Sequence, residues 1–337
     1  MSDNQSPFIT VCMPVWNEAA FIEETLFMVL HQDYPADRYE IIVADGGSDD
    51  GTVQIINKLQ AVHSQIILRH NPKKKSSSGR NIGFKEGRGD IFIIIDAHCY
   101  IPDNQLFKNI IKCFSKSGAA CLGRPQPLDP PGISIFQESV ARARKSKIGH
   151  GSDSMIYSGY EGYISPVSNG AIYKRAVIEK TGLVDEMFDA CEDVDYNYRV
   201  EQAGFKSYMS PDLTIKYFPR KDIRALFYQM ARYGKGRINL MAKHPDSITF
   251  KGLLPLFFIL GLILNILSIL IIPKIAVFLF LPYLMYLMAV CFTILMECKA
   301  RDVNSFIRFF NIFLTIHTGL GFGQLIGSFQ FIFKKIL

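Results

Sequence analysis

Residues 40–52 read EIIVADGGSDDGT and combine an expected strand, a glycine-rich turn and the start of a helix. Residues 40–44 are rich in β-branched and apolar side chains, as expected for a strand. Asp45 then begins a turn with two glycines, and residues 52–62 continue in a helical pattern. A strand that leads through a glycine-rich turn into a helix is the repeating step of a parallel sheet with helices on both faces.

The sequence on both sides of this stretch repeats the alternation. Residues 9–13 form one expected strand, and in the helix after it Ile22 and Leu26 share a face. A further strand is expected at 65–69, and the apolar run 90–95 is typical of a central buried strand. We therefore predict an α/β fold for the N-terminal part of the chain.

Polar residues follow three of the expected strands, at 14–18, 45–52 and 96–98. In open parallel sheets ligands bind beyond the carboxyl ends of the strands, so the three segments are expected to face one crevice. Residues 73–78, a run of lysines followed by serines, are interpreted as a solvated loop.

The pattern loosens over residues 126–165, where a helix is expected at 133–145 and a loop rich in Gly, Ser and Tyr follows. Flexible loops beside a cleft often close over a substrate. Regular structure is expected again at 168–173, then in a helix to about Lys180, and another helix begins near Glu192.

Two runs near the C-terminus are long and apolar enough to cross a membrane. Residues 253–272 and 275–296 contain no charge, and a bilayer crossing takes about 20 residues. Residues 309–333 are a third candidate span that carries His317; polar groups in such spans tend to be functional, while glycines allow close helix packing. The alternative, an apolar hairpin in a protein core, is disfavoured because core helices normally keep a polar stripe.

Residues 223–241 mix aromatic and basic side chains, a composition expected at a membrane surface. The net charge of +6 lies mostly at the end of the chain, where residues 253–337 hold six Lys and Arg against two acids. This distribution indicates membrane flanks and no nucleic-acid partner.

The cysteines indicate the compartment. Seven cysteines without a Cys-x-x-Cys pair fit a reducing environment, and no apolar stretch near Met1 is long enough for a signal peptide. We expect a multi-pass protein of the plasma (inner) membrane with three regions. They are a cytosolic domain at 1–220, an interfacial amphipathic segment at 221–252 and a transmembrane region at 253–337.

Four polar motifs occur in order: Pro-Val-Trp-Asn-Glu at 14–18, Ala-Asp-Gly-Gly-Ser-Asp-Asp-Gly-Thr at 44–52, Asp-Ala-His at 96–98 and Glu-Asp-Val-Asp at 192–195. None is specific alone, but together they resemble the family 2 glycosyltransferases over residues 8–240. The membrane helices are similar to those of the bacterial exopolysaccharide branch, which includes succinoglycan-type glucosyltransferases. The resemblance implies a GT-A fold, a mixed sheet flanked by helices, followed by a helical transmembrane region.

The resemblance assigns Asp193 as the catalytic base, which takes the proton of the acceptor hydroxyl as the hydroxyl attacks the anomeric carbon. Glu192 beside it would orient or screen the base, and clustered like charges are expected to raise one pKa. The alternative is that Glu192, Asp193 and Asp195 only cap a helix N-terminus.

The resemblance places Glu18, Asp45 and Arg80 at the nucleotide part of the donor. Asp45 would contact the base, because a carboxylate at a strand end accepts hydrogen bonds from a ligand across the sheet edge. Arg80 with Asn81 would open the helix before the central strand. Alternatively, Asp45 and Ser48 only shape their turn, and the other residues are ordinary surface or capping residues.

Asp96 and His98 are the candidate metal ligands, with Asp96 at the donor. A leaving diphosphate needs its charge neutralised, and a divalent ion held by a carboxylate and phosphate oxygens does this. The family pattern is Asp-x-Asp, so His98 is a departure that shifts the preference from Mg²⁺ toward Mn²⁺. The alternative for His98 is a packed or hydrogen-bonded histidine.

Gln229, Arg232 and Tyr233 reproduce part of the family's Gln-x-x-Arg-Trp signature, with Tyr in place of Trp. The resemblance places them at the wall of the acceptor and diphosphate site, where Arg232 would stabilise the charge of the leaving group. The alternative is that a basic residue on an interfacial helix contacts lipid headgroups.

These features predict a hexosyltransferase that depends on Mn²⁺ or Mg²⁺. It would transfer a sugar with inversion from a nucleotide-sugar donor, a UDP-sugar, to a lipid-linked saccharide in exopolysaccharide or cell-surface glycan synthesis. One alternative is a polyprenyl-phosphate sugar synthase, in which a phosphate attacks and no proton is removed. Another is a catalytically silent membrane assembly partner, for which His98 is the reason. A dinucleotide-binding dehydrogenase is disfavoured because no GxGxxG follows the first strand.

Overall fold

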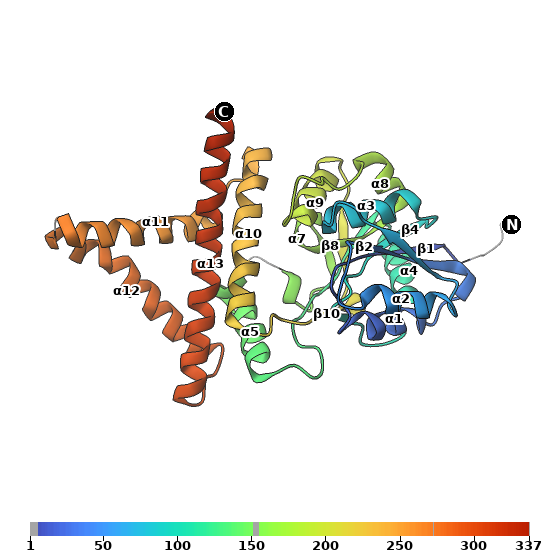
Figure 1. The fold of residues 1–337 in the computed structure, drawn as a ribbon, viewed down its shortest axis with the longest axis horizontal. Coiled ribbons are helices and arrows are strands. Elements are labelled where there is room, and N and C mark those ends of the chain that lie inside the picture. The colour runs from blue at the N-terminus through green and yellow to red at the C-terminus, as the bar shows by residue number, and fades with distance from the viewer. Residues whose placement is uncertain (1–5, 151–154, 272, 337) are drawn as a thin grey trace. The chain divides into compact units, whose positions relative to one another are not determined.

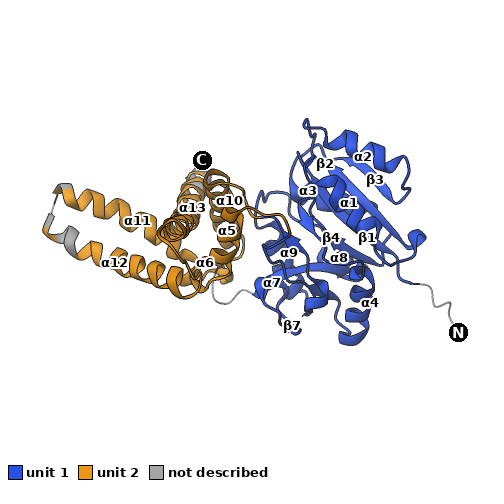
Figure 2. Ribbon diagram, turned by 90° about the horizontal axis from the view of Figure 1, so that it is seen from below, with its two compact units in different colours: residues 1–130, 155–218 blue, residues 131–154, 219–337 orange. Residues whose placement is uncertain are grey.

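The computed structural model describes residues 6–150, 155–271 and 273–336. The chain folds into two compact units (Figure 2). The first comprises residues 1–130 and 155–218, and the second comprises residues 131–154 and 219–337. The chain thus leaves the first unit after Pro130 and returns to it at Met155. The three regions expected from the sequence, with boundaries at 220 and 252, stay a prediction.

The first unit is built on an eight-stranded sheet in the order β3-β2-β1-β4-β8-β6-β9-β7 (Figure 1). Its strands are β1 (Ile9–Val15), β2 (Tyr39–Asp45), β3 (Ile66–His70), β4 (Ile91–Ile94), β6 (Cys121–Gly123), β7 (Gly162–Ile164), β8 (Gly170–Lys174) and β9 (Ser207–Met209). Strands β1 to β4 are parallel, whereas β8 runs antiparallel to both β4 and β6. The sheet is therefore mixed, and the predicted fold class is confirmed.

Helices cover both faces of this sheet (Figure 1). They are α1 (Ile22–Leu30), α2 (Thr52–Gln60) and α4 (Leu106–Ser117) on one face, and α3 (Ser76–Glu86), α8 (Arg175–Thr181) and α9 (Glu192–Gln202) on the other. Neighbouring side chains of β4 point to opposite faces, as strand geometry requires. Ile93 belongs to the core with Leu26 and Phe107, whereas Phe92 belongs to the core with Phe84. Burial on both faces explains why the strand sequences are almost wholly apolar.

Shorter elements complete the first unit. They are η1 (Ala36–Arg38), β5 (Cys99–Tyr100), η2 (Met155–Tyr157), α7 (Pro166–Asn169), η3 (Pro211–Leu213) and β10 (Lys216–Tyr217). Strands β5 and β10 form an antiparallel ribbon in which Tyr217 lies opposite Cys99. This pairing brings the end of the first unit beside the Asp-Ala-His motif at 96–98.

The interpretation of residues 73–78 as a solvated loop is wrong for its serines. Helix α3 begins at Ser76, and the two serines that follow are buried. Arg80 consequently lies inside α3 and does not open it. The helix packs closely on β1, since a Cβ atom at Gly83 would lie 2.4 Å from Sγ of Cys12. The approach of the helix to the strand is what buries this segment.

The second unit is helical. Its elements are α5 (Ile135–Lys145), α6 (Lys147–His150), α10 (Ile223–Lys243), η4 (Pro245–Ser247), α11 (Phe250–Ile271), α12 (Pro273–Met296) and α13 (Val303–Ile336). Among the residues that the structure describes, three stretches are long and apolar enough to cross a membrane: Phe250–Ile269, Phe278–Met296 and Val303–Phe333. Most side chains of α11 and α12 are exposed, as expected for helices that face lipid, whereas half of the span in α13 is buried within the protein.

Helix α13 lies at the centre of the second unit, and its glycines allow the neighbouring helices to pack closely against it. A Cβ atom at Gly323 would lie 2.0 Å from the carbonyl oxygen of Ala231 in α10, and one at Gly321 would lie 2.2 Å from that of Pro255 in α11. Any larger residue would push these helices apart. The glycines therefore serve close helix packing, as the sequence suggested.

His317 of α13 is held by two partners in the second unit. Its Nδ1 lies 2.8 Å from the hydroxyl oxygen of Tyr286 in α12, and its Nε2 lies 2.9 Å from the carbonyl oxygen of Ile148 in α6. The imidazole thus joins three helices. These contacts give the polar residue a structural role.

Candidate active site

The three polar segments that follow the strands meet, as predicted. The backbone N–H of Asn17 donates to Oγ of Ser48 at 2.8 Å, and that of Glu18 donates to Oγ1 of Thr52 at 2.9 Å. Oε1 of Glu18 lies 2.7 Å from Nδ1 of His98. The segment after β1 therefore contacts both the segment after β2 and the segment after β4. This edge of the sheet, where the parallel strands end, is where ligands bind in open α/β folds.

Asp45 uses its carboxylate to hold its own turn. Oδ2 accepts from the backbone N–H of Gly47 at 2.8 Å, and Oδ1 accepts from the hydroxyl of Ser48 at 2.6 Å. Gly47 has a φ of 82°, a conformation that favours glycine, so the Asp-Gly-Gly-Ser sequence is what this turn requires. The structure thus gives Asp45 the turn-shaping role, and contact with a nucleotide base stays a prediction.

Glu18 and His98 form a partly buried pair, with side-chain exposures of 17% and 28%. The ring of His98 meets the ring of Tyr217 edge to face, with the centroids 6.2 Å apart. The hydroxyl of Tyr217 in turn accepts from Nη2 of Arg124 at 2.7 Å. His98 is therefore a hydrogen-bonded histidine with a defined orientation, and Glu18 contacts the candidate metal site.

Arg80 connects α3 to the acidic cluster of α9. Its Nη2 lies 3.2 Å from Oε1 of Glu192, and both side chains are buried. Burial disfavours the charge of Arg80, but the fields of three carboxylates outweigh burial and raise the pKa of the guanidinium; they are Glu192, Asp96 and Asp193. Arg80 thus stays positive among the acids that end β4 and begin α9.

The three acids at the start of α9 lie in three different environments. Asp195 is fully buried and binds Arg199 at 3.1 Å. Glu192 is buried, which raises its pKa because the attraction of Arg80 only partly offsets the loss of water. Asp193 is exposed, and its Oδ1 accepts from the backbone N–H of Val194 at 2.9 Å. Only one carboxylate of the cluster therefore faces solvent.

The raised pKa in the acidic cluster is that of Glu192, which is not the residue expected to act as the base. The main cause is burial, while the neighbouring charge of Asp193 adds to it. The helix begins after Cys191, which has a φ of 64°.

The loop before α9 is held by side chains of α3 and of the turn before it. The side-chain amide of Asn81 donates to the carbonyl of Val184 at 2.9 Å and accepts from its N–H at 2.8 Å. Lys73 pairs with Glu186, and Lys75 donates to the carbonyl of Glu186 at 2.8 Å. Helix α3 and the turn before it thus fix the approach to the acidic cluster.

The sequence did not mark Arg124 as functional. It follows β6 and is 1% exposed, and among the described residues its Nε and Nη1 have no hydrogen-bond partner. Its contact with Tyr217 spans a large sequence separation. No local pattern announces such a residue, because its surroundings come from β10.

Gln229, Arg232 and Tyr233 lie in α10 of the second unit. Nε2 of Gln229 donates to the hydroxyl of Tyr233 at 3.3 Å, and the guanidinium of Arg144 lies 6.0 Å from the centroid of the Tyr233 ring. The aromatic face that replaces the family's Trp is thus used by a cation of α5. The role of the three residues at an acceptor site stays a prediction.

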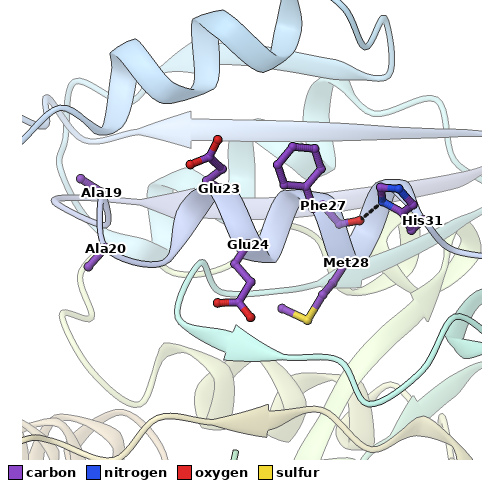
Figure 3. A pocket seen from close by; sticks show the side chains of 7 residues that line it. All are labelled: Ala19, Ala20, Glu23, Glu24, Phe27, Met28 and His31. Atoms are coloured by element: carbon purple, nitrogen blue, oxygen red, sulfur yellow. Dashed lines mark hydrogen bonds between the residues drawn. The ribbon is translucent and has the colours of Figure 1, made fainter. Parts of the chain in front are cut away.

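A shallow hollow on the surface of α1 contains none of the candidate residues (Figure 3). It is lined by Ala19, Ala20, Glu23, Glu24, Phe27, Met28 and His31. Nδ1 of His31 lies 2.8 Å from the carbonyl oxygen of Phe27. The two carboxylates of the hollow, those of Glu23 and Glu24, are exposed. The candidate residues of the first unit therefore lie outside this hollow, at the strand ends, in α3 and in α9.

Residues 10–180 match the sequence model described as glycosyl transferase family 2, which covers just over half of the chain. The chain belongs to glycosyl transferase family 2. It is therefore a glycosyltransferase, and the resemblance seen in its motifs is confirmed.

Curated relatives extend the similarity beyond the family domain. The family 2 chain is 28% identical over 303 residues to "Dolichyl N-acetyl-alpha-D-glucosaminyl phosphate 3-beta-D-2,3-diacetamido-2,3-dideoxy-beta-D-glucuronosyltransferase" of Methanococcus voltae, covering 83% of this chain and 93% of the relative. It is 30% identical over 248 residues to the succinoglycan biosynthesis protein ExoA of Rhizobium meliloti, covering 73% of this chain and 74% of the relative. The similarity thus includes much of the C-terminal helical part.

The fold is similar to the folds of solved glycosyltransferase structures. The mannosyltransferase PcManGT from Pyrobaculum calidifontis, in complex with GDP-Man and Mn²⁺, matches with a TM-score of 0.60 at 18% identity, over 97% of this chain and 88% of that one. GalNAc-T7 with UDP, GalNAc and Mn²⁺ matches with a TM-score of 0.52 at 17% identity, over 71% of this chain and 48% of that one. The first unit of the family 2 protein has the GT-A fold.

Proposed function

We propose that this family 2 protein is an inverting glycosyltransferase that moves a sugar from a nucleotide donor, a UDP-sugar, to a lipid-linked saccharide. The observation that carries the proposal is the arrangement at the start of α9. There the exposed carboxylate of Asp193 follows a buried ion pair of Glu192 with Arg80. An exposed acid fixed beside a buried cation is suited to meet an acceptor hydroxyl and a diphosphate together.

The reaction needs a general base for the acceptor hydroxyl and a positive group that stabilises the negative charge of the leaving diphosphate. Asp193 takes the proton of the acceptor hydroxyl while the oxygen of that hydroxyl bonds to the anomeric carbon of the sugar. The bond between that carbon and the diphosphate oxygen breaks, and the nucleoside diphosphate leaves with the bonding electrons. Arg80, whose charge is stabilised by the neighbouring carboxylates, adds a positive field for this anion.

Asp96 and His98 fit a divalent cation. Both follow β4, both are partly exposed, and they offer one carboxylate and one imidazole, a donor set that suits Mn²⁺ better than Mg²⁺. No group of three or more His, Cys, Asp or Glu gathers within the described stretches of the chain, so phosphate oxygens of the donor would complete the shell. The ion would neutralise the diphosphate.

The remaining candidates complete the proposal. Asp45 would hold the turn against which the nucleotide rests, and Gln229, Arg232 and Tyr233 would serve the acceptor or the leaving group. The apolar helices α11 to α13 would place the enzyme in the inner membrane as a multi-pass protein with its first unit in the cytosol. A lipid-linked acceptor is supported by the relative from Methanococcus voltae, whose name describes transfer to a dolichyl-phosphate-linked sugar.

The test uses the full chain in lipid nanodiscs, supplied with labelled nucleotide sugars and a polyprenyl-diphosphate saccharide. Replacing Asp193 with Asn should lower transfer by about 10²- to 10⁴-fold, the usual contribution of a general base. Donor binding should be unchanged, as followed by the fluorescence of Trp16, the single tryptophan of the chain, which lies among the residues after β1. Glu24→Gln, an exposed acid of α1, is the matched control.

Two results would overturn this assignment. Full transfer by Asp193→Asn would remove Asp193 from the mechanism. Transfer to polyprenyl phosphate alone, insensitive to the Asn variant, would replace the proposal by a polyprenyl-phosphate sugar synthase, because an anionic phosphate needs no base.

A further inference from the structure

The pair of Glu18 and His98 is the feature that the proposed reaction leaves unexplained. Their contact joins Oε1 to Nδ1 at 2.7 Å, within the range of a charge-assisted hydrogen bond. Glu18 would serve a nucleotide contact if it pointed to solvent, but it is only 17% exposed and points to the imidazole. A carboxylate bound to a ring nitrogen of a histidine is the usual arrangement behind a metal-bound histidine.

Both members of the pair are held in place from outside. The backbone N–H of Glu18 donates to the hydroxyl of Thr52, whose hydroxyl donates to Oδ1 of Asp50 at 2.5 Å. On the other side, the ring of His98 meets Tyr217, which binds the buried Arg124. The acidic turn after β2 and the β10 ribbon thus determine where carboxylate and imidazole meet. Such support is what a pre-oriented ligand needs.

The contact selects one tautomer of His98. When Nδ1 carries the proton and donates to Glu18, the lone pair of the neutral ring lies on Nε2, the nitrogen able to coordinate a metal. The carboxylate also fixes the orientation of the imidazole ring.

We infer that Glu18 is a positioning residue that makes His98 a ligand of the divalent ion, together with Asp96. This inference rests on the proposed transferase function, since the ion serves the donor's diphosphate. The chain would thus replace a second carboxylate by an imidazole coupled to Glu18. The ion preference follows: Mn²⁺ and Co²⁺ bind more tightly than Mg²⁺, which favours oxygen ligands.

The same geometry predicts that the two residues are coupled. An Asp at position 98 would bring a second carboxylate toward Glu18, and like charges so close repel each other. His98→Asp alone should therefore bind metal poorly, although it restores the family's Asp-x-Asp. The double variant Glu18→Gln/His98→Asp removes the repulsion, so it should bind metal better than His98→Asp and should favour Mg²⁺ over Mn²⁺.

The experiment measures ion binding directly. The full chain in nanodiscs is titrated with Mn²⁺ in the presence of UDP, and in a parallel arm GDP, while electron paramagnetic resonance follows free Mn²⁺. Pulsed measurements on the bound ion report hyperfine coupling to ¹⁴N of a coordinated imidazole. The variants are Glu18→Gln, His98→Asp and their combination, with Glu24→Gln as the control on exposed α1.

We expect ¹⁴N coupling in the unchanged protein and its loss in His98→Asp. Glu18→Gln should weaken Mn²⁺ binding by about 10- to 100-fold, the usual effect of removing the partner of a metal-bound histidine. The control should bind as the unchanged protein does. If Glu18→Gln does not fold, as judged by nucleotide binding without metal, the comparison of His98→Asp with the double variant carries the test.

Each contrary result has a definite meaning. Absence of ¹⁴N coupling in the unchanged protein would overturn His98 as a ligand. Unchanged Mn²⁺ binding in folded Glu18→Gln, or no gain from combining the substitutions, would overturn the positioning role of Glu18. In either case sugar transfer by the unchanged protein would leave the proposed function intact. Mn²⁺ binding with ¹⁴N coupling but no transfer to any acceptor would instead refute the proposed function.

Discussion

The two acidic segments of the first unit hold their carboxylates in opposite ways. In the segment 45–52, Asp45 binds backbone and hydroxyl groups of its own turn. In the segment 192–195, Glu192 depends on Arg80, which comes from a different helix, and Asp193 faces solvent. The first segment builds a surface on which a ligand can rest, whereas the second keeps one carboxylate available for chemistry.

This difference teaches which acids can be assigned from sequence. A carboxylate that completes a turn finds its partners within a few residues, so the turn sequence alone indicates its role. A carboxylate whose charge is tuned by burial and a distant cation gives no such local signal. The two segments should therefore respond differently to substitution.

The largest effect is expected from breaking the buried pair of Arg80 with Glu192. Arg80→Met leaves a buried carboxylate without its cation and should lower the free energy of unfolding of the first unit by about 3–5 kcal/mol. Thermal or denaturant unfolding followed by the fluorescence of Trp16 measures this. Arg69→Met is the matched control, because Arg69 pairs with Glu86 at the surface and should cost about 0–1 kcal/mol.

The double variant Arg80→Met/Glu192→Gln sharpens the reading. Removing the carboxylate should restore part of the lost stability, since no buried charge then stays uncompensated. Equal losses in Arg80→Met and Arg69→Met would mean that the acidic cluster does not depend on its distant cation.

A smaller effect is expected from the turn after β2. Asp45→Ala removes the acceptor of the Gly47 and Ser48 backbone N–H groups and should cost about 1–3 kcal/mol. Asp45→Asn keeps one carbonyl oxygen as an acceptor. Its free energy of unfolding should therefore lie between that of the unchanged protein and that of Asp45→Ala. Asp49→Ala, a neighbouring exposed acid, is the control, and a loss as large there would contradict the turn-shaping role of Asp45.

The sequence predicted what local rules determine. The strands of the parallel part, the meeting of the three polar segments and the long apolar helices of the second unit follow from patterns within single stretches of chain. The start of α3 at Ser76 was missed because only packing of its glycine face on β1 makes a serine run helical. Arg124 was missed because its hydrogen-bond partner, Tyr217, is remote in sequence.

The pH dependence of stability distinguishes the segments further. Burial raises the pKa of Glu192 in the folded protein above its ordinary value of 4.5, so the folded state binds more protons than the unfolded chain above that pH. The contribution of Glu192 is thus greatest below pH 4.5 and is lost as the pH rises through the folded pKa. Relative to Glu192→Gln, the unchanged protein should lose stability as the pH rises through this window. If the difference in the free energy of unfolding between the unchanged protein and Glu192→Gln stays constant across this pH range, the raised pKa of Glu192 is contradicted.

The smallest effect on stability is expected at the residue with the largest effect on catalysis. Asp193 is exposed and its one described hydrogen bond is to the adjacent N–H of Val194, so Asp193→Asn, which keeps an acceptor oxygen there, should change the free energy of unfolding by less than about 0.5 kcal/mol. The fluorescence of Trp16 during unfolding measures this on the same preparation used for transfer. Loss of transfer with unchanged stability would separate the chemical carboxylate from its buried neighbours. A loss of stability comparable to that of Arg80→Met would instead make Asp193 part of the buried network and remove the contrast between the two segments.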